Sequence, residues 1–126
     1  MTLLGYIDDV WPILRNADVV VGPCGASTVS EVAAARKSFI ALPQARPFDE
    51  QVAQASILQK YDLADVAWAW PDASSWPVLL ESAASRDGDR WRWYNDGRGS
   101  TRACEALLAA AGHSPIVPGT QSLHAY

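Results

Sequence analysis

The feature that most constrains the fold is the run Val19-Val20-Val21, which lies between Asp18 and Gly22. A continuous β-branched run without polar alternation is typical of a strand buried on both faces, as in a parallel sheet. The turn Gly22-Pro23-Cys24-Gly25 follows, and then a helical pattern over residues 28–36. This stretch therefore predicts a strand–turn–helix unit of an α/β protein.

Strand and helix patterns alternate over the rest of the chain as well. We expect strands at residues 3–6, 19–21, 39–42 and 66–69, and helices at residues 10–17, 28–36, 49–60, 75–80 and 100–111. Short connections between such elements imply right-handed crossovers. The sequence therefore predicts an α/β, Rossmann-like, three-layer parallel sheet with helices on both faces.

The apolar spacing also predicts which side chains face the core. The predicted inner faces of the helices are Val10, Ile13, Leu14 and Ala17; Val29, Val32, Ala33 and Ala34; and Val52, Ala53, Ile57 and Leu58. Trp68 and Trp70 alternate with alanines, as in a half-buried strand. Most of the six tryptophans are therefore expected in the core or covering the sheet.

Length and composition exclude several classes of protein. A chain of 126 residues has room for one core, and a net charge of −4 with scattered basic residues argues against a nucleic-acid binder. The start of the chain lacks a signal-peptide pattern, and no apolar run could form a transmembrane segment. Cys24 and Cys104 form no disulfide framework and lack metal-ligand spacing. We expect a cytoplasmic protein that needs no metal and no cofactor.

The turn after the valine strand has the chemistry of an anion site. Glycine lets a phosphate approach the backbone, and the first amides of a helix point their N–H groups at it. Ser27 and Thr28 add hydroxyl donors, and Glu31 offers a carboxylate to vicinal hydroxyls such as those of a ribose. The alternative is structural, because Thr28-Val29-Ser30-Glu31 is also a capping-box pattern.

A second polar segment, Arg46-Pro47-Phe48-Asp49-Glu50-Gln51, follows the next predicted strand. Asp49 is the predicted N-cap of the helix that begins there. Because the carboxyl ends of parallel strands meet at one edge of the sheet, both segments are expected to face one crevice.

Together with Asp96-Gly97-Arg98-Gly99 before the last helix, these segments resemble the GT-B glycosyltransferases. The similarity is to the C-terminal, donor-binding domain of the kind found in the N-acetylglucosaminyltransferases of peptidoglycan lipid-intermediate synthesis, and in related macrolide and plant transferases. It runs from about Leu4 to Ala111.

The resemblance implies a role for each matching residue. Gly25, Ala26, Ser27 and Thr28 would surround the donor diphosphate, Glu31 would accept from the ribose hydroxyls, and Glu50 and Gln51 would contact the transferred sugar. The alternative for the last two is a first-turn acidic residue and a solvated glutamine. Pro23 stands where plant-type relatives place a histidine, and Arg46, or less favourably Arg36, would replace that phosphate contact.

The resemblance also implies missing parts. The family domain would open with a strand, a second glycine-rich phosphate loop, a helix and a further strand, so the domain is expected to be N-terminally incomplete. In this family the acceptor site and the usual catalytic base belong to an N-terminal half, so the catalytic residues are unknown. Neither His113 nor His124 fits the role of the catalytic base. We expect a nucleotide-sugar-binding domain over residues 1–111, a disordered tail over 112–126, and an uncovered apolar surface that favours self-association.

The function implied is that of a glycosyltransferase donor-binding domain. It would bind a UDP-linked sugar and transfer the sugar to an acceptor held by an N-terminal domain or partner chain, which could place it at the inner membrane surface. The alternative is a non-catalytic nucleotide-binding or assembly subunit, or an inactive remnant. A dinucleotide-dependent oxidoreductase is disfavoured, because no Gly-x-Gly-x-x-Gly follows a strand.

Overall fold

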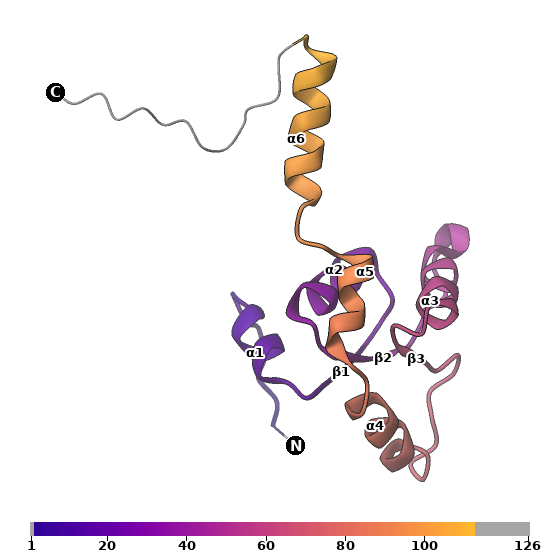
Figure 1. Cartoon of the computed structure of the whole chain (residues 1–126). Coiled ribbons are helices and arrows are strands. Elements are labelled where there is room, and N and C mark those ends of the chain that lie inside the picture. The colour runs from indigo at the N-terminus through magenta and orange to yellow at the C-terminus, as the bar shows by residue number, and fades with distance from the viewer. Residues whose placement is uncertain (1, 113–126) are drawn as a thin grey trace, which may run out of the picture. The chain divides into compact units, whose positions relative to one another are not determined.

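The computed structural model describes residues 2–112, so the expected tail lies almost wholly outside the described residues. The described chain falls into two compact units that divide between Asn95 and Asp96. Figure 1 labels the elements of both units. The helices are α1 (Trp11–Asn16), α2 (Ala26–Ala35), α3 (Glu50–Lys60), α4 (Trp76–Ala84), α5 (Trp91–Tyr94) and α6 (Gly99–Ala110), and the strands are β1 (Val19–Gly22), β2 (Ser38–Ala41) and β3 (Asp65–Val66). Two 3₁₀ turns, at Pro47–Asp49 and Gly88–Arg90, complete them.

The three strands form one parallel sheet in the order β1-β2-β3. Val19 pairs with Ser38, and Ile40 pairs with Asp65. The predicted strand at residues 66–69 is shorter than expected: the backbone N–H of Ala67 still donates to Ala41 at 2.9 Å, and the chain then leaves the sheet. The parallel α/β sheet predicted from the sequence is confirmed in these three strands.

The strand predicted at residues 3–6 is wrong. This segment has no regular structure, and Leu3 and Tyr6 are 84% and 92% exposed. A strand is stabilised by backbone hydrogen bonds to a neighbouring strand, and the described residues provide none beside it. The apolar pattern alone could not supply that partner.

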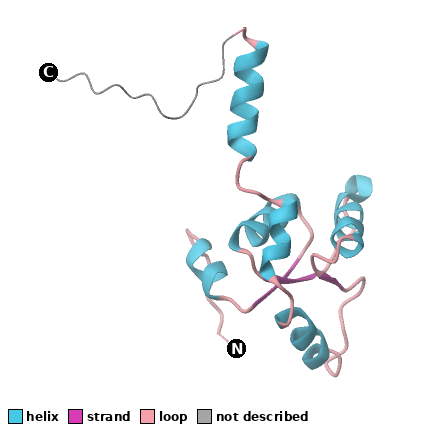
Figure 2. Cartoon of the chain, viewed as in Figure 1, coloured by secondary structure: helices cyan, strands magenta, loops and turns pink. Residues whose placement is uncertain are grey.

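Helices cover both faces of the sheet, as predicted. The core cluster joins Phe39 and Ala41 of β2 to α2, α3 and α5 on one face. Ile40 points to the other face, where α4 packs across the strands and buries Ala83. Figure 2 shows α4 below the strands, with α2 and α5 above them. The unit formed by residues 2–95 thus has three layers.

The predicted helix face is right for α2 at three of its four residues and wrong in larger part on α1 and α3. Val29, Val32 and Ala33 are fully buried, whereas Ala34 is exposed. On α3 the buried residues are Gln51, Ala55 and Leu58 rather than Val52, Ala53 and Ile57. On α1 only Leu14 is buried. The inner face of α3 begins with a polar residue, so a search for apolar spacing assigned the wrong face.

The tryptophans also depart from the prediction. Trp91 is buried, but Trp68 and Trp70 are 50% and 75% exposed because they follow the last sheet residues. Trp91 begins the short helix α5, which the sequence pattern did not reveal. Its indole N–H donates to the carbonyl of Lys37 at 2.8 Å, and Tyr94 accepts from Gln54 at 2.8 Å. These two contacts fix α5 against the α2–β2 turn, which holds Arg36 and Lys37, and against α3.

A set of ion pairs ties the segment between α4 and α5 to β3 and to the turn between α3 and β3. Arg86 donates through Nε and Nη2 to the two carboxylate oxygens of Asp65, at 2.9 and 2.8 Å. Arg86 and Arg90 also both donate to Asp62. These hydrogen bonds hold the pKa of Asp62 below its usual value. Bidentate arginine–carboxylate pairs are among the stronger polar contacts, so this set fixes the segment between α4 and α5.

The second unit contains α6, which confirms the helix predicted over residues 100–111. Asp96 accepts a backbone hydrogen bond from Arg98 at 2.9 Å and forms an ion pair with Arg102. The predicted loop before the helix is therefore an ordered turn. Hydrogen bonds from Arg102 and Arg98 lower the pKa of Asp96.

Gly88 provides a test of how the 3₁₀ turn before α5 packs against the turn between α2 and β2. A Cβ atom at this position would lie 2.3 Å from the backbone carbonyl oxygen of Arg36, where neither atom can move without shifting the backbone. Gly88→Ala is therefore expected to lower the free energy of unfolding by about 1–3 kcal/mol. Urea denaturation followed by tryptophan fluorescence would measure the change.

Gly99→Ala is the matched control, because no heavy atom lies within 4 Å of a Cβ built there. Gly99 is the first residue of α6, where alanine is favoured over glycine. Equal stability of the Gly88→Ala variant and wild type would contradict the packing described for the α2–β2 turn.

Candidate functional site

The amino terminus of α2 lacks a cap from the protein itself. The helix begins earlier than predicted, with Gly25 as its N-cap, and its first hydrogen bond joins the amide of Val29 to the carbonyl of Gly25 at 3.0 Å. No side chain caps it, so the capping-box alternative is wrong: Thr28 already lies inside the helix. Within residues 2–112 the backbone amides of Ala26, Ser27 and Thr28, here called the α2 amides, donate to no protein acceptor.

The geometry of Gly25 leaves room in front of the α2 amides. Its φ of −65° and ψ of 147° are open to any residue, so its backbone conformation does not require glycine. A Cβ atom there would find its nearest neighbour, Nε2 of Gln51, at 4.0 Å. Neither conformation nor internal packing therefore explains this glycine, whereas close approach of a ligand to the backbone would.

The exposed face of α2 carries the other polar residues predicted for this site. Ser27 and Glu31 are both exposed and lie four residues apart, which places them on one side of the helix. Thr28 is half-buried beside them, with its methyl group 3.7 Å from the Cβ position of Gly22. The helix thus presents hydroxyl donors at its first turn and a carboxylate one turn later.

Gln51 connects this helix start to the next loop. Its side-chain oxygen accepts from the backbone N–H of Cys24 at 3.1 Å and from that of Gln44 at 3.0 Å. Gln51 is only 5% exposed, so the alternative of a solvated glutamine is wrong. We call this arrangement of Gln51, Cys24 and Gln44 the glutamine clamp.

The remaining predicted residues lie on the loop before α3. Glu50 is exposed at the first position of α3, and Arg46 is exposed with Nη2 donating to the side-chain oxygen of Gln44 at 3.1 Å. Asp49 precedes α3 as predicted, but its side chain makes no capping hydrogen bond. Phe48 and Asp49 both have positive φ, 67° and 50°, and Phe48 is 100% exposed. Positive φ is unfavourable for both residues and marks this loop as locally strained.

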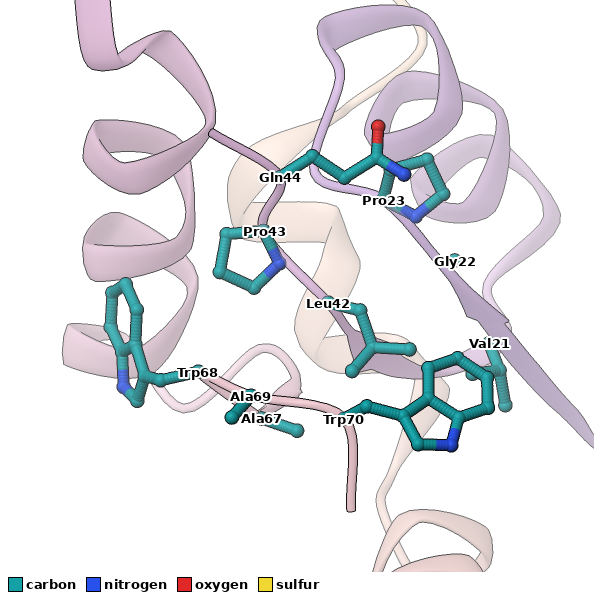
Figure 3. Close-up of a pocket in the computed structure, with 10 residues that line it drawn as sticks. All are labelled: Val21, Gly22, Pro23, Leu42, Pro43, Gln44, Ala67, Trp68, Ala69 and Trp70. Atoms are coloured by element: carbon teal, nitrogen blue, oxygen red, sulfur yellow. The ribbon is translucent and has the colours of Figure 1, made fainter. Parts of the chain in front are cut away.

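A pocket of about 460 Å³ opens at the carboxyl ends of all three strands. Its walls come from the ends of β1, β2 and β3: Val21, Gly22, Pro23, Leu42, Pro43, Gln44, Ala67, Trp68, Ala69 and Trp70. Figure 3 shows the Trp70 indole beside Leu42 and Val21, with Gln44 above Pro43. Gln44 is the one lining residue with a polar side chain apart from the two indoles, so the pocket is mostly apolar.

Sequence reasoning missed most of this pocket, although it placed the crevice at the correct edge of the sheet. In the sequence Pro23 stands out only as a departure from relatives, and the alternation of Trp68 and Trp70 with alanines predicts a strand. The pattern of residues that end three successive strands would have identified the lining. None of the predicted donor-binding residues lines it: Gly25, Ala26, Ser27, Thr28, Glu31, Arg46, Glu50 and Gln51. Arg36 ends α2 at the opposite end from the α2 amides. Arg36 is therefore excluded as a phosphate contact.

Other features of the described chain bear on cofactors and membranes. Residues 2–112 contain no group of histidine, cysteine and acidic side chains suited to hold a metal ion. None of the helices in this range has the length and apolar character needed to cross a bilayer. Cys24 is buried in the core, and this burial raises the pKa of its thiol to about 11. Cys24 therefore supports the loop through its backbone N–H rather than through thiol chemistry.

The sequence comparisons decide the family. A family model described as the glycosyltransferase family 28 C-terminal domain matches residues 1–75, which include β1, α2, β2, α3 and β3. The chain belongs to the glycosyltransferase family 28 C-terminal domain family. The resemblance to GT-B donor-binding domains inferred from the sequence is thereby confirmed, and the uncapped α2 helix lies within the matched part of this family 28 domain.

Two curated relatives bear the same printed name, UDP-N-acetylglucosamine–N-acetylmuramyl-(pentapeptide) pyrophosphoryl-undecaprenol N-acetylglucosamine transferase. The one from Bordetella pertussis is 35% identical over 109 residues, covering 86% of this chain and 29% of the relative. The one from Bordetella parapertussis is 34% identical over the same length and the same shares. The chain thus spans about 29% of the length of these relatives. No solved structure matches the chain.

The two cysteines give a test of the turn between β1 and α2, in which Cys24 lies. At pH 8 a thiol with a pKa of about 11 is almost entirely protonated and reacts slowly, and Cys24 is also buried. Iodoacetamide is therefore expected to label the exposed Cys104 and to leave Cys24 unmodified in the native protein. Peptide mass spectrometry would measure both sites. Labelling in 8 M urea, where both must react, is the control, and equal native rates would contradict the buried position of Cys24.

Proposed function

We propose that this family 28 domain is the donor-binding part of a glycosyltransferase that uses a nucleoside-diphosphate sugar. The observation that carries the proposal is the set of free α2 amides, which begin three residues after Pro23, a residue that lines the pocket at the strand ends. Three backbone N–H groups and the positive end of a ten-residue helix suit a diphosphate without requiring a cationic side chain. The apolar pocket beside them suits the uncharged parts of such a ligand.

The proposed roles follow the order of the residues along α2 and α3. The backbone from Gly25 to Thr28 binds the diphosphate, and the Ser27 and Thr28 hydroxyls add donors. Glu31 accepts from the ribose hydroxyls one turn further along. Glu50, exposed at the start of α3, contacts the transferred sugar.

Arg46 supplies the cationic contact that Pro23 does not provide. Its guanidinium is already held at Gln44, beside the pocket. The printed names of the two Bordetella relatives include a UDP-linked donor, and for this chain we propose UDP as the carrier.

We further propose that the acceptor is bound by an N-terminal domain or a partner chain, which could position the domain at the inner face of the membrane. The outer edge of β1, unpaired within the described residues, supports the proposal that a further part of the protein continues this sheet. Gly22 accepts from Leu42 on the β2 side, so Val19 and Val21 direct their backbone groups to the other edge, where the described residues supply no partner. A valine run typical of an interior strand therefore lies at an edge, with Val21 40% exposed.

The test of the proposed function is UDP binding by isothermal titration calorimetry. The wild-type chain is expected to bind UDP, and Glu31→Ala is expected to weaken binding about tenfold or more, because a hydrogen bond to a charged group contributes about 1.5–3 kcal/mol. The fold should be unaffected, since the Glu31 side chain is exposed.

Glu81→Ala, which removes an exposed carboxylate from α4, is the matched control and should bind UDP as the wild type does. If the wild-type chain binds no UDP, the proposed function is refuted. If Glu31→Ala and Glu81→Ala bind UDP equally, the assignment of the ribose to Glu31 fails while the diphosphate site stands.

A further inference from the structure

The glutamine clamp joins the two loops that form the candidate site. Cys24 lies in the turn between β1 and α2, one residue before the N-cap of that helix, and Gln44 lies in the loop between β2 and α3. One oxygen atom, Oε1 of Gln51, accepts a backbone hydrogen bond from each, at 3.1 and 3.0 Å. Loops separated by a whole strand and helix in sequence are thus tied together at a single atom.

This arrangement limits what the side chain of Gln51 can do for a ligand. A carbonyl oxygen has two lone pairs, and both are already used by the backbone donors. Gln51 therefore cannot accept a hydrogen bond from a sugar hydroxyl without releasing part of the clamp. Only its Nε2 group remains for a ligand, and that group lies 4.0 Å from a Cβ position built on Gly25, at the proposed phosphate end of the site.

We infer that Gln51 is a positioning residue, which fixes the α2 amides for a diphosphate by holding the Cys24 turn against the Gln44 loop. The inference rests on the proposed nucleotide-binding function. Gln51 is 5% exposed and Cys24 is 1% exposed, so loss of the acceptor would leave a buried N–H group without a partner. A buried polar group in that state is unfavourable, and the turn that precedes Gly25 must shift to solvate it.

The same clamp also sets the position of Arg46. The Gln44 backbone is held by Gln51, while the Gln44 side chain accepts from Arg46. One buried amide thereby orients both of the proposed phosphate-binding groups, the helix start and the guanidinium. A residue whose single role was to contact the transferred sugar would affect sugar nucleotides and leave UDP binding unchanged.

The test compares UDP with UDP-N-acetylglucosamine in calorimetry on the full chain. Gln51→Met keeps the length of the side chain and removes the acceptor. It is expected to lower the affinity for both ligands by a similar factor of about ten. Gln59→Met, at an exposed position of the same helix, is the control and should bind as the wild type does. Unchanged UDP affinity in Gln51→Met, with loss confined to the sugar nucleotide, would overturn the inference in favour of a sugar contact.

Amide hydrogen exchange measured by NMR provides a readout that is independent of ligand. The amides of Cys24 and Gln44 are expected to exchange slowly in the wild type and in Gln51→Glu, which keeps an acceptor for both, and much faster in Gln51→Met. If Gln51→Met does not fold, the Gln51→Glu variant decides, since fast exchange at both amides in that folded protein would refute the clamp. Absence of UDP binding by the wild type would refute the proposed function, and the inference with it, before any variant is compared.

Discussion

The central strand β2 is the element on which the rest of the described domain depends. All four of its residues are buried, and it pairs on both sides, with β1 and with β3. Phe39 and Ala41 face the layer of α2, α3 and α5, while Ile40 faces α4. Because all three strands are parallel, the loops that leave β1 and β2 emerge at the same edge of the sheet. The position of the candidate site is therefore a consequence of how β2 is paired.

At that edge the protein departs from the usual rules of local stability. A helix of ten residues begins with no side-chain cap, and the loop before α3 holds Phe48 and Asp49 at positive φ. A serine or aspartate at the N-cap would typically stabilise such a helix by about 1 kcal/mol. Missing caps are not confined to this edge, because α3, α4 and α6 also begin without a side-chain cap; what distinguishes α2 is that it follows a strand end that lines the pocket. The buried Gln51 between the two loops limits how far either loop can relax.

The sequence predicted the elements that depend on local pattern and failed where the partner was distant. The valine run and the apolar face of α2 specify β1 and α2 by themselves, and both are confirmed. Residues 3–6 form a short apolar segment that also suggests a strand, but a strand needs a neighbour as well. Likewise, α5 is fixed by the contact of Trp91 with Lys37, which are 54 positions apart.

For the site, the turn and the helix start were predictable because glycine, hydroxyl and acidic residues follow a strand end in order. The clamp was not predictable, because nothing local distinguishes a glutamine that accepts from two loops from a solvated one at a helix start. Its burial depends on Ala55 and Leu58 facing the core, whereas the apolar spacing predicts Leu58 together with Val52 and Ile57. A one-position error in assigning the face of α3 thus concealed the residue that joins the two halves of the site.

The outer edge of β1 is the place where a further strand would continue the sheet of this domain. A further parallel strand paired there would use the outward backbone groups of Val19 and Val21 and would bring its own carboxyl end to the edge where the α2 amides lie. A loop leaving that strand would then face the same crevice from the side opposite the Gln44 loop. This is the position that the proposed strand–helix–strand unit, with its second phosphate loop, would occupy in the family domain. Completion of the sheet and completion of the diphosphate site would then depend on the same strand pairing.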